Sequence, residues 1–138
     1  MADSKTMKLQ IISPDRIFYD GDVEMVETTT TEGDMGIYPE HIPLTAIVAP
    51  GVLTIHEPEG VKEAALHDGF IEIQKKKVVI LAESCEWPEE IDVHRAEEAK
   101  IRAERRLKST EGEINEYRAE AALRRSITRI SLAEKYKR

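Results

Sequence analysis

The chain has 138 residues, of which 41% are hydrophobic and 34% are charged, and its formal net charge is −7. This length suits one ordinary domain or a small domain with an appendage, and the composition is typical of a folded chain with much solvated surface. The acidic balance argues against general nucleic-acid binding, because basic surface supplies most of that affinity. Cys85 is the single cysteine, which excludes an internal disulfide.

We expect contact with a membrane only through partners. Residues 1–6 lack the apolar core of a signal peptide, and no run reaches the ~18 apolar residues of a transmembrane helix. The charge is uneven, since residues 119–138 hold six Lys or Arg against two Glu on an otherwise acidic chain. This basic segment is predicted to fold back on the acidic body or to dock on an acidic partner.

Residues 7–86 carry the alternating and β-branched runs of short strands, separated by Gly and Pro turn signals. A strand at roughly every ten residues indicates an antiparallel β-sandwich or barrel. Turns are predicted at Asp20-Gly21, 32–36 and Asp68-Gly69, because Gly accepts positive φ, and 39–43 is predicted to be an irregular connection. The predicted strands cover residues 8–12, 16–19, 23–29, 52–56, 61–66, 70–74 and 78–82.

The chain changes character at Trp87-Pro88, which we take as the boundary between a β domain, 1–87, and a helical domain, 88–138. Asp92 is a suitable N-cap for a helix that runs from Val93 to about Lys108. Small apolar residues at spacings of three and four give this helix a narrow stripe, formed by Ala96, Ala99, Ala103 and Leu107.

A second helix is predicted from Glu111 to about Tyr136, and Thr110 with Glu113 fits a capping box at its start. The short break between the helices predicts an antiparallel hairpin. Because alanine side chains bury little surface, we expect the hairpin to be held weakly and to be able to detach. The fold class is therefore α+β, an N-terminal antiparallel β-sandwich followed by a two-helix hairpin. The second helix has an apolar stripe of Ala119, Leu123, Ile127, Ile130 and Ala133.

Nothing in the chain favours catalysis or a metal site. The four histidines are scattered and have no metal-ligand spacing with Cys85, so they are interpreted as surface or packing residues. No Gly-rich phosphate loop and no nucleophile signature occurs. Cys85, at the end of a predicted strand, is interpreted as a small packed residue.

The arginines of the helical domain have a spacing that suits an anion. Arg125 and Arg129 lie four apart, hence on one face of a helix, and Arg95 lies near the start of the preceding helix. A closed hairpin can present all three to one place, and guanidinium groups bind phosphate in bidentate fashion. Glu86 and Asp92 supply acceptors for a nucleoside or for the arginines. On composition alone, a solvated charged face is the simpler interpretation.

An ordered set of motifs resembles the epsilon subunit of bacterial F-type ATP synthases, from about Met7 to the end of the chain. Each motif is weak alone, and their order is specific. The motifs are Phe18-Tyr19-Asp20-Gly21, Thr31-Glu32-Gly33-Asp34-Met35-Gly36-Ile37, His41-Ile42-Pro43-Leu44, Pro50-Gly51, Gly69-Phe70-Ile71-Glu72-Ile73 and Val79-Ile80-Leu81-Ala82.

The resemblance implies a non-catalytic rotor subunit at the cytoplasmic face of the bacterial plasma membrane. It implies that the β-sandwich attaches to the gamma subunit and the c-ring. It also implies that the hairpin switches between a folded and an extended form, and that the extended form reaches the catalytic beta subunits and resists ATP hydrolysis. The basic segment fits such a contact, because the matching beta-subunit region in this family is acidic.

Some members of this family bind ATP through an Ile/Leu-Asp-x-x-Arg-Ala motif, which reads Ile91-Asp92-Val93-His94-Arg95-Ala96 here. The resemblance implies ATP as a regulatory ligand that is not turned over and that stabilises the folded hairpin. Two other functions stay open from the residues alone, a stand-alone nucleotide-sensing protein and a small nucleotide hydrolase. The implied nucleotide-binding residues are Glu86, Ile91, Asp92, Arg95, Ala96, Arg125 and Arg129.

Overall fold

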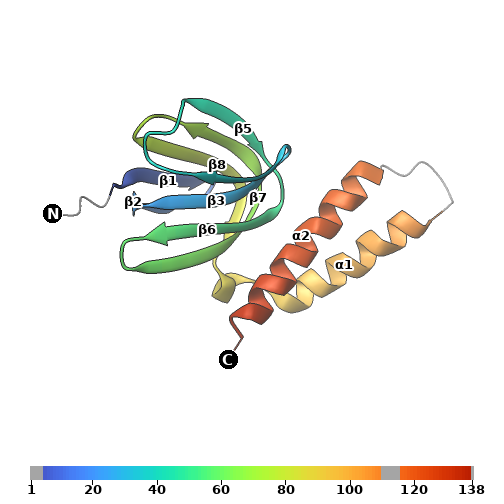
Figure 1. Ribbon diagram of the computed structural model, residues 1–138. Coiled ribbons are helices and arrows are strands. Elements are labelled where there is room, and N and C mark those ends of the chain that lie inside the picture. Colours follow the sequence, from blue (N-terminus) through green and yellow to red (C-terminus); the bar gives the residue numbers. More distant parts are fainter. Residues whose placement is uncertain (1–4, 110–115, 138) are drawn as a thin grey trace.

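The computed structural model describes residues 5–109 and 116–137, which form a β-sandwich with a pair of helices beside it (Figure 1). Helix α2 lies between the sandwich and α1, so α1 reaches the rest of the molecule mainly through α2. The elements of the described residues are β1 (Met7–Ser13), β2 (Arg16–Val23), β3 (Met25–Thr30), β4 (Gly33–Ile37), β5 (Leu44–Val48), β6 (Gly51–Glu57), β7 (Gly60–Ile73), β8 (Lys77–Glu86), a short 3₁₀ helix η1 (Pro88–Glu90), α1 (Val93–Lys108) and α2 (Glu116–Lys135).

The strands follow the order β2-β1-β8-β7-β5-β3-β4, and β6 pairs with β3 and β7. Neighbouring strands are antiparallel except β1 and β8, which pair in parallel. They are the first and last strands along the chain, so the six strands that lie between them in sequence supply the long connection that a parallel pair needs. The predicted α+β fold, a sandwich followed by a helix pair, is confirmed, with one parallel pair that the sequence did not predict.

The core is aliphatic and follows the two-residue period of the strands. Leu9 and Ile11 of β1, Ile71 of β7 and Val78 and Ile80 of β8 are completely buried between the layers. Each such side chain stabilises the fold by about 1.5–3 kcal/mol relative to exposure. The sandwich therefore provides a rigid base against which the helices dock.

Strand β7 is continuous through Asp68-Gly69, where the sequence predicted a turn. Asp68 and Gly69 have positive φ, 50° and 144°, yet the residues on both sides keep one register with β8. The two positive φ values kink the strand and exchange its faces. Ala65 lies outside the main core before the kink, whereas Ile71 and Ile73 point into it after the kink. The predicted turn is therefore wrong, and a kink takes its place.

Two further turn predictions are wrong, and one strand was not predicted. Asp20-Gly21 lies within β2, where a Cβ on Gly21 would sit 3.1 Å from the Tyr19 hydroxyl, so this glycine permits a close approach within a strand. Residues 33–36 of the predicted turn region 32–36 belong to β4, which pairs with β3. Residues 44–48, which received no prediction, form β5 and pair with the second half of β7.

The start of the hairpin is confirmed. Asp92 caps α1, accepting a hydrogen bond from the Arg95 backbone N–H at 3.1 Å, and the helix covers Val93–Lys108 as predicted. The predicted stripe is confirmed in part, since Ala96 and Ala103 are buried. The predicted helix start at Glu111 and the capping box of Thr110 and Glu113 lie outside the described residues.

The buried surface of α2 is broader than the predicted stripe. Ala119 is buried as expected, but Ile127 is 46% exposed. Buried Ser126, Thr128 and Leu132 complete the packed surface. Because α2 packs against both the sandwich and α1, it buries two sides, and a single stripe could not describe it (Figure 1).

Candidate functional site

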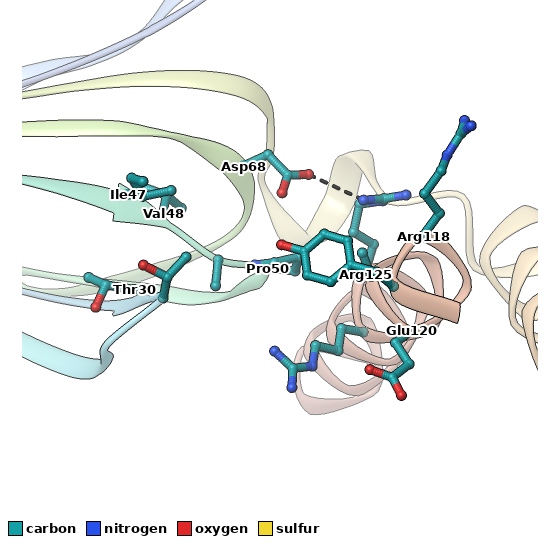
Figure 2. Close-up of a pocket in the computed structure, with 13 residues that line it drawn as sticks. Thr30, Ile47, Val48, Pro50, Asp68, Arg118, Glu120 and Arg125 are labelled. Atoms are coloured by element: carbon teal, nitrogen blue, oxygen red, sulfur yellow. Dashed lines mark hydrogen bonds and ion pairs between the residues drawn. The ribbon is translucent and has the colours of Figure 1, made fainter. Parts of the chain in front are cut away.

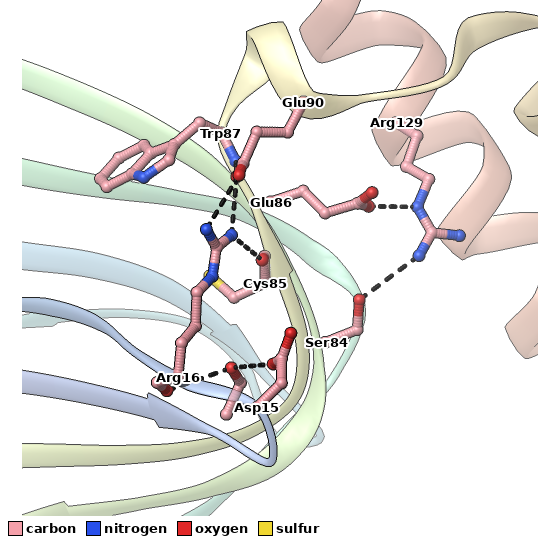
Figure 3. Close-up of polar contacts among 9 residues, drawn as sticks. Asp15, Arg16, Ser84, Cys85, Glu86, Trp87, Glu90 and Arg129 are labelled. Carbon is pink, nitrogen blue, oxygen red and sulfur yellow. Dashed lines mark hydrogen bonds and ion pairs between the residues drawn. The ribbon is translucent and has the colours of Figure 1, made fainter.

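The segment through which the chain leaves the sandwich, residues 85–90, is held against β2 by hydrogen bonds and ring stacking. Arg16 donates to both carboxylate oxygens of Glu90 in η1, at 2.9 and 2.7 Å, and to the Cys85 carbonyl oxygen at 3.5 Å (Figure 3). This hydrogen bonding holds the pKa of Glu90 below its usual range. Trp87 stacks on Phe18 with ring centroids 4.3 Å apart. The point from which the hairpin departs is therefore fixed to β2.

The apolar contact between the hairpin and the sandwich is small. Ala65 of β7, Ile91 and Leu132 of α2 form a buried cluster separate from the main core. Half-buried Val52 and Val93 pack around it. The cluster is much smaller than the sandwich core, which supports the prediction of weak docking.

Among the described residues, polar contacts at three places add to the docking of α2 on the strands. Arg125 pairs with Asp68 at 3.2 Å and Arg129 Nε pairs with Glu86 at 2.6 Å. Glu63 accepts from Lys135 Nζ at 2.6 Å and from the Tyr136 hydroxyl at 2.7 Å. These side chains are partly exposed, so each ion pair is worth about 0–1 kcal/mol and weakens with salt.

The contact at Glu63 shifts the pKa of two of its groups, the Glu63 carboxyl and the Tyr136 phenol. Burial alone raises the pKa of Glu63, but hydrogen bonds from Lys135 and Tyr136 outweigh burial and hold it below its usual range. The hydrogen bond to Glu63 raises the pKa of Tyr136 to about 12. The carboxylate therefore stays charged at working pH and the phenol stays protonated, which keeps the contact intact.

Two cavities lie where α2 meets the sandwich. One of about 480 Å³ opens between the β3–β4 and β5–β6 connections and the first half of α2 (Figure 2). In it Arg125 turns toward Asp68, whereas Arg118 points away. The other, about 420 Å³, lies between β7, β8 and the middle of α2, and its lining consists of Pro14, His67, Asp68, Glu83, Ser84, Arg125 and Arg129.

His67 lies against the second cavity and is completely buried, and neither ring nitrogen has a hydrogen-bond partner among the described residues. Burial, and then the charges of Arg129 and Arg125, lower the pKa of His67 to about 3. An unpaired buried polar group costs about 1–3 kcal/mol. Sequence reasoning treated His67 as one more surface or packing histidine. Its place directly before Asp68-Gly69 was the available signal in the sequence.

The structure brings together part of the predicted site. Arg129 contacts Glu86 and also donates to Ser84 Oγ at 3.4 Å (Figure 3). Arg125 lines the same cavity as Arg129. The predicted grouping of Glu86 with these two arginines is thus present in the docked hairpin.

The remaining predicted residues lie apart from that cavity. Ile91 is buried in the cluster with Ala65 and Leu132, at 8% exposure, and Ala96 is a buried residue of α1, at 3% exposure. Asp92 is occupied as the cap of α1. Arg95 is exposed, and its side chain forms no ion pair within residues 5–109 and 116–137. Whether these residues share one ligand with Arg125 and Arg129 stays a prediction.

Within the same described ranges, no helix combines the length and the apolar character needed to cross a membrane. No group of three or more His, Cys, Asp or Glu side chains there is arranged to hold a metal ion.

Two family descriptions match consecutive parts of the chain. Residues 6–88 match "ATP synthase, Delta/Epsilon chain, beta-sandwich domain", and residues 89–134 match "ATP synthase, Delta/Epsilon chain, long alpha-helix domain". The chain is 45% identical over 133 residues to the ATP synthase epsilon chain of Caldanaerobacter subterraneus subsp. tengcongensis, covering 96% of each. It is 43% identical over 129 residues to that of Halalkalibacterium halodurans, covering 93% of this chain and 97% of the relative.

Two solved structures share the fold at low identity. A chain of the Euglena gracilis mitochondrial ATP synthase, solved with OSCP, F1 and c-ring, has a TM-score of 0.80 at 22% identity, covering 94% of this chain and 82% of that one. A chain of the Tetrahymena thermophila mitochondrial ATP synthase, from a structure of its central stalk and c-ring, has a TM-score of 0.60 at 15% identity, with 96% of each covered.

Proposed function

The chain belongs to the ATP synthase epsilon-chain family and is a non-catalytic central-stalk subunit, and from that premise we propose how its two parts divide the work. The β-sandwich attaches the chain to the gamma subunit and the c-ring. The hairpin is a switch that restrains ATP hydrolysis when it extends toward the beta subunits, and ATP binding holds it folded. Through these partners the chain lies at the cytoplasmic face of the bacterial plasma membrane.

An exposed apolar row on the sandwich supports the attachment to gamma. Ile47, Phe70 and Leu81 are direct cross-strand neighbours on β5, β7 and β8, and each is about half exposed. The row continues through Ile12 of β1 to Ile17 of β2, which is 62% exposed. Contiguous apolar surface of this kind marks a protein contact. It lies beyond the kink of β7, and Ile47 at one end of it borders the cavity beside α2.

A second apolar group supports the contact with the c-ring. Tyr38 and Ile42 lie in the connection between β4 and β5 and are 57% and 78% exposed. Leu44, at the start of β5, adds to them. A separate patch at one end of the sandwich leaves room for a second rotor partner while gamma occupies the strand face.

The docking of α2 supports the switch. One small apolar cluster and three partly exposed polar contacts hold the helix pair, whereas the sandwich has a complete core of its own. Release therefore exposes little apolar surface and frees basic side chains of α2 for an acidic partner. The ion pair between Arg16 and Glu90 keeps η1 on the sandwich when the hairpin is released.

Reversing the charge of Arg129 is expected to release the hairpin. In Arg129→Glu, a carboxylate faces Glu86 in place of the 2.6 Å ion pair, so the population of released hairpin should rise roughly tenfold. Energy transfer between dyes on the sandwich and on α2 measures that population. Adding Glu86→Arg should restore docking, and Arg105→Glu on exposed α1 is the matched control. Equal populations in all four proteins would remove this contact from the switch.

The residues around the second cavity fit the chemistry of a bound ATP, and the complete Ile-Asp-x-x-Arg-Ala motif is the observation that carries the proposal. Two guanidinium groups face one cavity, each balanced by one carboxylate, so a phosphate chain can replace or join those carboxylates. Arg129 and Arg125 hold the phosphates and Glu86 accepts from the nucleoside. The motif adds Arg95 and Asp92 at the start of α1, which lie outside this cavity in the described form. ATP supplies a multiply charged bridge between helix and sandwich, which stabilises the docked form by its higher affinity for it.

Calorimetry of the isolated chain tests this site. ATP is expected to bind, and Arg129→Ala and Arg95→Ala are each expected to weaken it tenfold or more, because each removes a charge-assisted contact worth about 1.5–3 kcal/mol. Arg105→Ala, on the exposed side of α1, should bind as the parent does. ADP and GTP titrations report selectivity. No heat with ATP, or unchanged affinity in both site variants, would overturn the nucleotide proposal.

A further inference from the structure

The kink in β7 determines where His67 points. Ala64 and Leu66 belong to the main core, whereas Ala65 packs against Leu132 of α2. Strand alternation therefore places His67 on the same outer face as Ala65, under α2. The helix is what covers this side chain, and His67 is fully buried with both ring nitrogens unpaired among the described residues.

The charged groups around His67 come from three elements. Helix α2 contributes Arg125 and Arg129, strand β8 contributes Glu83, and β7 itself contributes Asp68. The β1–β2 turn adds only Pro14, and the cross-strand neighbour Ser84 is uncharged. Asp68 pairs with Arg125, and Glu86 of β8 pairs with Arg129. No carboxylate within these residues accepts a hydrogen bond from the imidazole. Glu83, the one carboxylate of the lining that pairs with neither arginine, is exposed to solvent, so it balances a third positive charge beside the two arginines only weakly.

We propose that His67 is a proton sensor for the hairpin: α2 docks on the sandwich while His67 is neutral, and protonation of His67 drives α2 off. The inference rests on the proposed release of the hairpin and adds the signal that drives it. In a chain that serves a proton-translocating synthase, acidification of the surrounding solution would then favour the inhibitory, extended form.

The direction of the effect follows from the two protonation equilibria. Burial and the two arginines lower the pKa of His67 to about 3 in the docked form, and exposure on release returns it to about 6.5. Docking is thus fully favoured above about pH 6.5 and weakens as pH falls toward 3. Below about pH 6.5, each fall of one pH unit raises the release constant about tenfold, whereas above it the constant changes little. The rise from pH 7.5 to 5.5 is therefore about tenfold.

The test uses the full chain without nucleotide, with dyes on cysteines introduced at exposed Glu59 and Glu134. Energy transfer is measured between pH 8 and pH 5 at fixed salt. The parent should show the tenfold rise in release between pH 7.5 and pH 5.5, and His67→Gln should be flat above pH 5. His67→Leu provides a second neutral side chain, and Trp87 fluorescence confirms that each variant keeps its sandwich. His94→Gln removes an exposed histidine of α1 and should behave as the parent does.

Lys135→Glu separates the two proposals, because it breaks the Lys135–Glu63 ion pair without touching the surroundings of His67. In this background release is raised and its pH dependence is easily measured. Release that follows pH equally in the presence and absence of His67 would overturn the sensor and leave the switch standing. Absence of any release in Lys135→Glu would overturn the switch itself. Loss of the response above pH 5 only in the His67 variants supports the sensor.

Discussion

Replacing Gly69 by alanine is expected to lower the free energy of unfolding by about 3–5 kcal/mol, a large part of the stability of a domain this size. Gly69 has a φ of 144°, a conformation that residues with a Cβ rarely adopt. A Cβ there would also lie 2.0 Å from the Leu81 carbonyl oxygen and 3.0 Å from the Ala82 Cα. Backbone strain and the clash with β8 each contribute about 1–3 kcal/mol.

Urea unfolding followed by Trp87 fluorescence measures this loss, and Gly60→Ala is the matched control. Gly60 opens the same strand, and a Cβ added there would meet no atom within 4 Å. It should change the free energy of unfolding by less than about 1 kcal/mol. Equal unfolding curves for Gly69→Ala and Gly60→Ala would contradict the account of the kink.

The kink links this stability to function. Before it, β7 presents Ala65 and His67 to α2, and after it the strand presents Phe70 to solvent. Strand β7 thus contributes both to the surface on which α2 docks and to the proposed attachment face. A straight strand would keep one parity along its length and could not serve both surfaces with the same core.

The sequence could predict what local chemistry decides. The cap at Asp92 and the helix start at Val93 were predicted to the residue, because an aspartate before an apolar period satisfies the first unpaired N–H groups of a helix. The apolar runs at residues 8–12 and 78–82 likewise predicted strands, and both lie within β1 and β8. The continuous β7 could not be predicted, because Asp-Gly suits a turn and a kink equally and the pairing with β8 decides between them.

The candidate site shows the same division. Spacing placed Arg125 and Arg129 on one face of a helix, and both do face the sandwich. Their carboxylate partners, Asp68 and Glu86, come from β7 and β8. The pairing of Arg125 with Asp68 depends on tertiary packing, so the sequence could not predict it. The burial of His67 escaped prediction because it depends on a helix far along the chain.

Placing a charge in the apolar row is expected to detach the chain from the rotor. Phe70 is the central member, between Ile47 and Leu81, and is 56% exposed. Phe70→Asp removes a large apolar contact and would bury an unpaired carboxylate in the interface. Either effect costs several kcal/mol at a protein contact, so affinity for the gamma–c-ring assembly should fall at least 100-fold.

Reconstitution of an epsilon-depleted synthase, followed by co-purification of the added chain, measures the loss. Val61→Asp is the matched control, because Val61 is equally exposed, at 56%, but lies at the start of β7 near the turn from β6. Both variants should unfold like the parent, since neither side chain belongs to the core. If the Phe70 variant binds as well as the Val61 variant, the rotor contacts another surface, and the exposed group at Tyr38 and Ile42 becomes the first place to search.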